Sequence, residues 1–287
     1  MEYRTFGQTG IKLSVVGIGG LLAHYEGVLG SEPPEEKRRI YLRAVELGVN
    51  LFDMGYGDEV HIPNELKGNR DELHFALKLG GPPPKELPQL VERHLVNLRR
   101  DYIDILRVHH ASYREIDGLA EAIAHLKNSG KIRALCLIRH DLPDQDAYVE
   151  RGPEPEADGD LVAYNYVYRY QEPGIAKAAQ AGKGVLIMKA LGGQWLSWED
   201  MTTTDWTTAN EETVVKLAVS KHVKNYLDLI YPLVSGPWRE LTEPGETIPR
   251  TERAIRWVLK NPGVSSILVA VANVAELEAV GLMIVDC

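Results

Sequence analysis

The stretch Gly48-Val-Asn-Leu-Phe-Asp53-Met-Gly-Tyr56-Gly57 decides the fold that the rest of the sequence predicts. Residues 50–52 are typical of a short buried strand, and this strand ends in the carboxylate of Asp53. The phenol of Tyr56 follows three residues later, on what the neighbouring glycines predict to be a flexible loop. An acid and a phenol therefore stand where a strand stops.

Two further apolar segments end in the same way. Residues 73–77 lead to the ammonium of Lys78, and residues 103–108 lead to the imidazole of His109. Parallel strands that close into a barrel end at one mouth, where such barrels carry their catalytic residues. The sequence therefore predicts an enzyme whose site gathers an acid, a phenol, an ammonium and an imidazole.

Composition excludes several other classes of protein. The 287 residues carry 32 basic and 41 acidic side chains, a net charge of −9, which disfavours a general binder of nucleic acid or of anionic membranes. No apolar run approaches the length of a membrane span, and the first residues lack the pattern of a signal peptide. The two cysteines, Cys136 and Cys287, form no CxxC motif. We expect a reduced, cytoplasmic protein.

The chain alternates strands and helices along most of its length. Residues 2–13 predict a hairpin that closes the barrel floor. Strands are expected at 15–20, 50–53, 73–78, 103–109, 132–137, 160–164, 184–188 and 265–270. Helices are expected at 34–47, 62–67, 85–99, 116–128, 172–181, 249–260 and 274–282, with an irregular stretch before residue 159.

Eight strand–helix units predict a parallel sheet closed as a (β/α)8 TIM barrel, so residues 1–287 are expected to form a single domain. Residues 194–249 interrupt the alternation after the seventh strand, and we interpret them as a lid-like insertion over the mouth. The glycines of residues 15–20 do not complete the GxGxxG spacing of a dinucleotide-binding loop.

The four mouth residues suit proton transfer at an oxygen bound to carbon. A nearby lysine cation lowers the pKa of a tyrosine toward the useful range, and an aspartate keeps that lysine charged. His109 can orient a carbonyl by donating a hydrogen bond. The plain alternative is a set of structural ion pairs, since those also shift pKa values. A metal site is not expected, because adjacent His109 and His110 face opposite ways and no HExxH motif accompanies His140.

Several motifs make the sequence resemble the aldo-keto reductase superfamily over nearly its full length. They are residues 2–20, 44–53, 101–109, 129–133, 184–193 and 256–266. Within the family, the Met188-Lys189 pair is most similar to the bacterial branch whose members often carry a C-terminal iron–sulfur extension, and no cysteine cluster of that kind is present here.

The resemblance implies a barrel that reduces carbonyl compounds with NADP or NAD as cofactor. It implies Tyr56 as the general acid, assisted by Asp53, Lys78 and His109. It implies cofactor contacts at Gly19, Gly20, Lys189, Leu191, Gly192, Val271, Asn273 and Glu276. We expect substrate contacts at His110, Arg139, His140, Tyr164 and Trp195.

The sequence departs from the family pattern where the cofactor is held. The tyrosine follows the aspartate by three residues, a shorter spacing than is usual, and Ile138-Arg139 replaces the Ser-Asn pair that normally binds the nicotinamide amide. Leu161 replaces a glutamine, and Val271 lies in a loop that has lost the arginine that pairs with a 2′-phosphate.

Three hypotheses remain open at this stage. The first is a nicotinamide-dependent reductase of an aldehyde, ketone or sugar-like carbonyl, acting on a small molecule. The second is a non-redox lyase, dehydratase or isomerase on the same barrel, with Arg139 clamping an anionic substrate. The third is a non-catalytic binding or regulatory subunit, since a fold does not guarantee a function.

Overall fold

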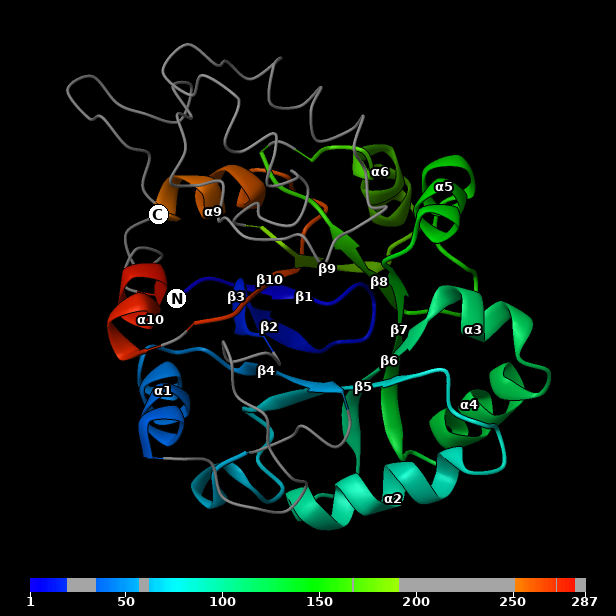
Figure 1. Cartoon of the computed structure of the whole chain (residues 1–287), viewed down its shortest axis with the longest axis horizontal. Coiled ribbons are helices and arrows are strands. Elements are labelled where there is room, and N and C mark those ends of the chain that lie inside the picture. Colours follow the sequence, from blue (N-terminus) through cyan, green and yellow to red (C-terminus); the bar gives the residue numbers. More distant parts are fainter. Residues whose placement is uncertain (20–34, 57–61, 167, 191–250, 272, 282–287) are drawn as a thin grey trace, which may run out of the picture.

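The computed structural model describes residues 1–19, 35–56, 62–166, 168–190, 251–271 and 273–281 (Figure 1). Eight parallel strands close into a barrel in the order β10-β3-β4-β5-β6-β7-β8-β9, with helices around it. An antiparallel hairpin, β1-β2, precedes the barrel. The predicted (β/α)8 barrel with an N-terminal hairpin is confirmed.

The element bounds agree with most of the predicted ranges. The strands are β1 (Tyr3–Thr5), β2 (Lys12–Ser14), β3 (Val16–Ile18), β4 (Leu51–Tyr56), β5 (His74–Gly80), β6 (Ile103–His109), β7 (Ile132–Arg139), β8 (Gly159–Ala163), β9 (Gly184–Met188) and β10 (Ser266–Val269). The helices are α1 (Glu35–Glu46), α2 (Leu87–Leu98), α3 (His110–Glu115), α4 (Leu119–Asn128), α5 (Leu142–Arg151), α6 (Glu172–Gln180), α9 (Thr251–Leu259) and α10 (Val274–Gly281), with a 3-10 turn at Asn64–Leu66.

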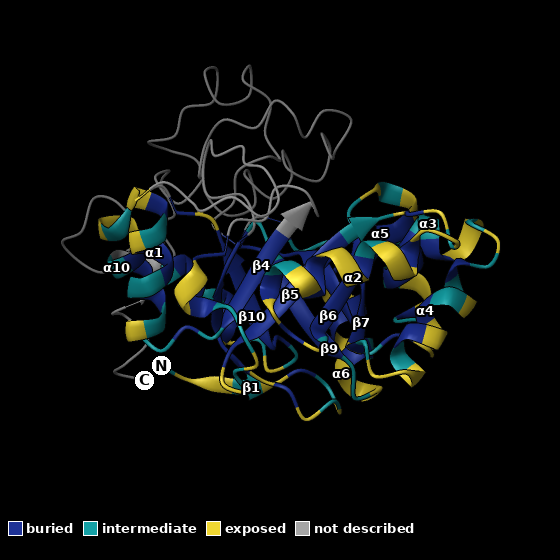
Figure 2. Ribbon diagram, turned by 90° about the horizontal axis from the view of Figure 1, so that it is seen from below, coloured by how far each residue is buried: buried dark blue, intermediate teal, exposed yellow. Residues whose placement is uncertain are grey.

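Two apolar layers hold these elements together. One fills the barrel interior and includes Leu51, Ile105 and Ile138, and the other lies between the sheet and the helices. Figure 2 shows the strands buried and the outward faces of the helices exposed. Successive side chains of a strand point to opposite faces. Residues of the first layer therefore face the barrel interior, and residues of the second layer face the helices.

The hairpin closes the floor of the barrel with an aromatic plug. Phe6, between β1 and β2, is fully buried in the interior layer. Its ring occupies the space beside Gly159 and Gly184, where an added Cβ would lie 2.4 Å and 2.2 Å from ring carbons. Glycine at these two strand starts is therefore what lets the plug enter.

The structure corrects four local predictions. Strand β4 continues through Tyr56, which the sequence placed on a loop, and its register with β5 shifts between Asp53 and Tyr56. A short helix, α3, begins directly after His109. Strand β7 runs two residues further than predicted, to Arg139.

The fourth correction is α5, in the segment that was expected to be irregular. Its proline lies in the first helical turn, where no intrahelical donor is lost, and Gly152 ends the helix with φ of +85°. The Pro/Gly content that suggested irregular chain therefore marks the two ends of a helix. The proposed lid, residues 194–249, lies outside the described residues, and no described helix is long and apolar enough to cross a membrane.

Candidate active site

The barrel brings the ends of β4, β5 and β6 side by side. Tyr56 pairs in register with Lys78, and Lys78 pairs in register with Arg107 of β6. His109 ends β6 two residues later, on the same face of that strand as Arg107. The register thus places Asp53, Lys78 and His109 at one mouth of the barrel, with the backbone of Tyr56 on β4, the strand that carries Asp53.

A buried arginine that the sequence reasoning missed binds the aspartate. The Arg107 guanidinium donates a hydrogen bond to the Asp53 carboxylate, and both side chains are nearly inaccessible to solvent. We predicted that the Asp53 carboxylate keeps Lys78 charged. The structure shows this carboxylate bound to the guanidinium of Arg107, which lies in the barrel interior. The signal was available, because Arg107 lies two residues before His109 and shares its inward parity.

A second pair of basic groups lies at the ends of β7 and β9. The Lys189 Nζ lies 3.2 Å from His140 Nε2. Burial, and then the positive charge of Lys78, lowers the pKa of Lys189 to about 7. Burial, and then the charges of Lys189, Lys78 and His109, lowers the pKa of His140 to about 3. The predicted contacts Lys189 and His140 therefore belong to the same electrostatic cluster as Lys78.

His109 responds to the same surroundings. Burial is the first cause that lowers its pKa below the usual 6.5, and the neighbouring Lys78 charge is the second. At neutral pH the imidazole is therefore uncharged, and an uncharged ring can still donate one hydrogen bond. We name the set Lys78, His109, His140 and Lys189 the cationic mouth after its two lysines, since both imidazole rings are neutral at pH 7.

Asn165 fixes the backbone beneath the cationic mouth. Lys189 adopts a left-handed conformation, with φ of +62°, that is unusual for a residue with a side chain. The Asn165 side-chain amide donates to the Lys189 carbonyl oxygen at 3.0 Å, and its oxygen accepts from the Tyr168 N–H at 2.8 Å. Asn165 therefore positions the Lys189 backbone, and it was not among the contacts predicted from the sequence.

The clamp assigned to Arg139 is wrong. Ile138 belongs to the barrel interior, so Arg139 faces the opposite way, into the layer beneath α5. Its Nε donates to Asp160 at 2.7 Å, its guanidinium lies 5.3 Å from the centre of the Tyr148 ring, and the side chain is fully buried. It cannot reach a substrate in the mouth.

Two other predicted substrate contacts also point away from the mouth. The ring nitrogens of His110 bind the carboxylates of Asp144 at 2.8 Å and Glu154 at 2.7 Å. The Tyr164 hydroxyl donates to Glu172 at 2.8 Å, and its ring lies 5.3 Å from that of Trp257. The structure gives both residues places between strands and helices, so we leave them out of the proposed site.

The residues expected to hold a cofactor are partly described. Gly19 N–H donates to the Val269 carbonyl at 2.5 Å, a close approach that a Cβ would crowd at 3.0 Å. Val271 is buried, and the Asn273 side chain accepts from the Glu276 N–H at 2.9 Å, which caps α10. Further predicted contacts, Gly20, Leu191, Gly192 and Trp195, lie outside the described residues.

The described residues fit one part of a nicotinamide dinucleotide better than another. The cationic mouth complements its phosphates. The carboxamide needs a donor and an acceptor, yet the inward side chain at the end of β7 is the apolar Ile138, which offers neither. In the described part of the chain, no cluster of three or more His, Cys, Asp or Glu side chains is arranged for a metal ion.

Comparison with known proteins agrees with this barrel. The model of the aldo/keto reductase family matches residues 16–282. Aldo-keto reductase YhdN of Bacillus subtilis is 24% identical over 307 residues, covering 97% of this chain and 87% of its own. L-galactose dehydrogenase of Arabidopsis thaliana is 24% identical over 298 residues, covering 97% and 86%. The holo form of an aldo-keto reductase from Bacillus halodurans superposes with a TM-score of 0.68 at 20% identity, covering 100% of this chain and 91% of that one.

These matches define the class of protein. The chain belongs to the aldo/keto reductase family. It is an enzyme, an oxidoreductase, and members of this family generally use NAD(P)H.

Proposed function

We propose that this protein reduces an aldehyde, ketone or sugar-like carbonyl with NADPH or NADH, and that Tyr56 is the general acid. The observation that carries the proposal is the pairing of Tyr56 with Lys78 on adjacent strands, next to the end of the strand that carries His109. Family membership supports the same reaction class.

The proton side of the reaction depends on Lys78. Its ammonium lies on the strand paired with Tyr56, where a cation stabilises a phenolate and so lowers the pKa of the phenol. Because Arg107 binds the Asp53 carboxylate, that carboxylate is not an isolated negative charge on β4. The tyrosine can then give its proton to the developing alkoxide.

The carbonyl is held by His109 in this proposal. Its lowered pKa keeps the ring neutral at pH 7, so it donates a hydrogen bond to the carbonyl oxygen without competing as a proton source. Burial strengthens such a hydrogen bond, because less water screens it.

The cofactor is assigned to Lys189, which stands over the mouth at the end of β9 and would pair with its phosphates. When bound, a reduced nicotinamide supplies the hydride that no side chain can provide. Asn165 holds the Lys189 backbone in place for this contact.

The non-redox alternative has lost its motivating residue, because Arg139 faces the helices. A non-catalytic subunit is disfavoured by membership of a family of oxidoreductases. Of the three hypotheses, the reductase is the one we retain.

The test begins with titration of the purified protein with NADPH and NADH, followed by calorimetry or tryptophan fluorescence. We expect one of them to bind, and we expect Tyr56→Phe to retain that affinity while its kcat for carbonyl substrates falls by about 10²–10⁴-fold. Tyr3→Phe, in the hairpin, is the matched control. Folded protein that binds neither cofactor, or full turnover in Tyr56→Phe, would overturn the proposal.

A further inference from the structure

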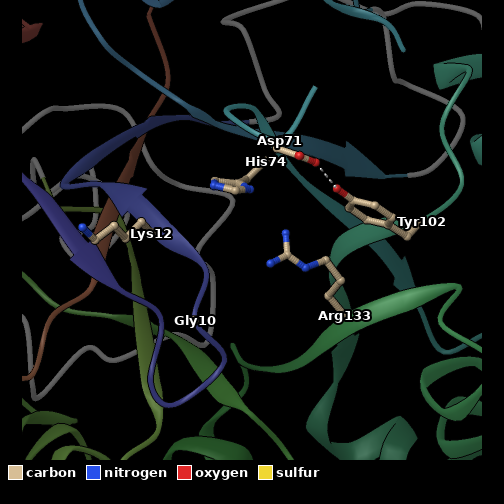
Figure 3. Close-up of a pocket in the computed structure, with 6 residues that line it drawn as sticks. All are labelled: Gly10, Lys12, Asp71, His74, Tyr102 and Arg133. Carbon is tan, nitrogen blue, oxygen red and sulfur yellow. Dashed lines mark hydrogen bonds between the residues drawn. The ribbon is translucent and has the colours of Figure 1, made fainter. Parts of the chain in front are cut away.

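A cavity lies at the floor of the barrel, beside the hairpin and the starts of the strands (Figure 3). Its volume is about 240 Å³. It is lined by Gly10, Lys12, Asp71, His74, Tyr102 and Arg133, which come from the hairpin, the loop before β5 and the starts of β5, β6 and β7. We name it the floor cavity. Pockets for drug-sized ligands are larger, so its size suits a molecule of a few non-hydrogen atoms.

A fully buried carboxylate organises the polar wall of the floor cavity. Asp104 Oδ1 accepts from Arg133 Nη1 at 2.8 Å and lies 3.1 Å from His74 Nδ1. A carboxylate only accepts, so the Nδ1 of His74 carries the proton. In the neutral ring the other nitrogen, Nε2, then presents a lone pair, and His74 lines the cavity.

Arg133 uses only one nitrogen of its guanidinium to bind Asp104, which leaves the other two able to bind a ligand. It gives Nη1 to Asp104 and stacks 5.4 Å from the centre of the Tyr102 ring. Among the described residues, no acceptor is bound to its Nε or Nη2, and its side chain is 35% exposed. These two nitrogens form an edge that binds a carboxylate through two parallel hydrogen bonds.

The cavity also contains an acidic group. The Asp71 carboxylate accepts a hydrogen bond from the Tyr102 hydroxyl at 3.2 Å. Figure 3 shows the His74 ring and the Arg133 guanidinium directed toward the same space, with Asp71 and Tyr102 on one side and the hairpin residue Gly10 on the other. A second cation, Lys12, also lines the cavity, and Figure 3 shows its ammonium end on the far side from the Arg133 guanidinium and the Asp71 carboxylate. The part of the cavity between Arg133 and Asp71 thus offers a guanidinium donor together with acceptors at Asp71 and His74 Nε2.

We propose that the floor cavity binds a small zwitterion of the α-amino-acid class. Its carboxylate pairs with Nε and Nη2 of Arg133, and its ammonium faces the Asp71 carboxylate and the Nε2 of His74. A simple anion would leave Asp71 as a nearby repelling charge, whereas a zwitterion satisfies both signs. The site is independent of the proposed reductase chemistry, because it uses no residue of the cationic mouth.

The experiment compares glycine, acetate and methylammonium as ligands of the full chain, by ligand-detected NMR and calorimetry. We expect saturable binding of glycine and at least about tenfold weaker binding of acetate and of methylammonium. Arg133→Lys removes the two-nitrogen edge and should weaken glycine about tenfold or more. Arg151→Lys, an exposed arginine on α5, is the matched control and should bind as the unaltered protein does.

Asp71→Asn sharpens the test, because Asp71 is exposed and the substitution keeps an acceptor for Tyr102 while removing the charge. We expect this variant to lose the preference for glycine over acetate. No binding of glycine, equal binding of acetate and glycine to the unaltered protein, or glycine affinity unchanged in Arg133→Lys would each overturn the proposal.

Discussion

The two ends of this barrel use basic side chains in opposite ways. At the floor, His74, Arg100 and Arg133 gather around the buried carboxylate of Asp104. At the mouth, Lys78 and Lys189 lie beside the neutral rings of His109 and His140, and the lysine charges add to burial in lowering pKa values. Opposite charges in contact stabilise a structure, whereas basic groups that lower one another's pKa are typical of places where chemistry or binding uses them.

The comparison also explains why the mouth is the better candidate for catalysis. The carboxyl ends of barrel strands carry active sites, and the amino ends contribute mainly to stability. The floor network follows that rule in its contacts, since the Asp104 carboxylate also accepts from the Phe75 backbone at 3.0 Å. The floor cavity is an addition to this network, on the side of Arg133 that Asp104 does not use.

The largest expected effect is a loss of enzymatic activity when a residue of the mouth is changed. Lys78→Met should lower kcat by about 10²–10⁴-fold, because the phenol of Tyr56 loses the cation that makes it a usable acid. Lys85→Met, exposed and shortly after the same strand, is the control. Steady-state kinetics measure kcat, and thermal melts check that the variant is folded. A folded variant with full activity would show that Lys78 does not assist the general acid.

The second prediction addresses stability at the floor. Asp104→Asn should lower the free energy of unfolding by about 3–5 kcal/mol, because it leaves buried cations without their carboxylate. The kcat of the folded fraction should be almost unchanged, since Asp104 lies at the end away from the mouth. Urea denaturation measures the loss, with the exposed Asp117→Asn as control. A loss below about 1 kcal/mol would show that the floor cations do not depend on this partner.

The smallest expected effect is a pH dependence in two quantities: the free energy of unfolding should rise with pH, and the affinity for the cofactor should fall. The pKa of Lys189 is about 7 in the folded protein and near 10.4 in an unfolded chain. Between those values the unfolded chain holds a proton that the folded chain lacks, so this residue makes the free energy of unfolding rise with pH. Over the lower part of that window the mouth loses positive charge, so affinity for an anionic cofactor should fall as pH rises through 7.

Lys189→Met should flatten both curves, whereas the exposed Lys260→Met should leave them unchanged. Denaturation and cofactor titration from pH 6 to pH 9 measure them. An affinity that stays constant through pH 7 in the unaltered protein would contradict the placement of Lys189 against the phosphates.

The sequence by itself determined the barrel and the membership of its mouth. Apolar segments ending in Asp53, Lys78 and His109 were enough, because parallel strands in one barrel stop at a common edge whatever their detailed packing. The hairpin and most element bounds followed from local patterns of the same kind.

Tertiary structure alone decided which way the side chains at the strand ends point and what they bind. Successive side chains of a strand point to opposite faces, so the continuation of β7 to residue 139 turns Ile138 to the interior and Arg139 toward the helices, where it cannot clamp a substrate. The pairing of Asp53 with Arg107, and the approach of Lys189 to His140, join residues far apart in the chain. Such contacts depend on strand register and barrel closure, which no local pattern encodes.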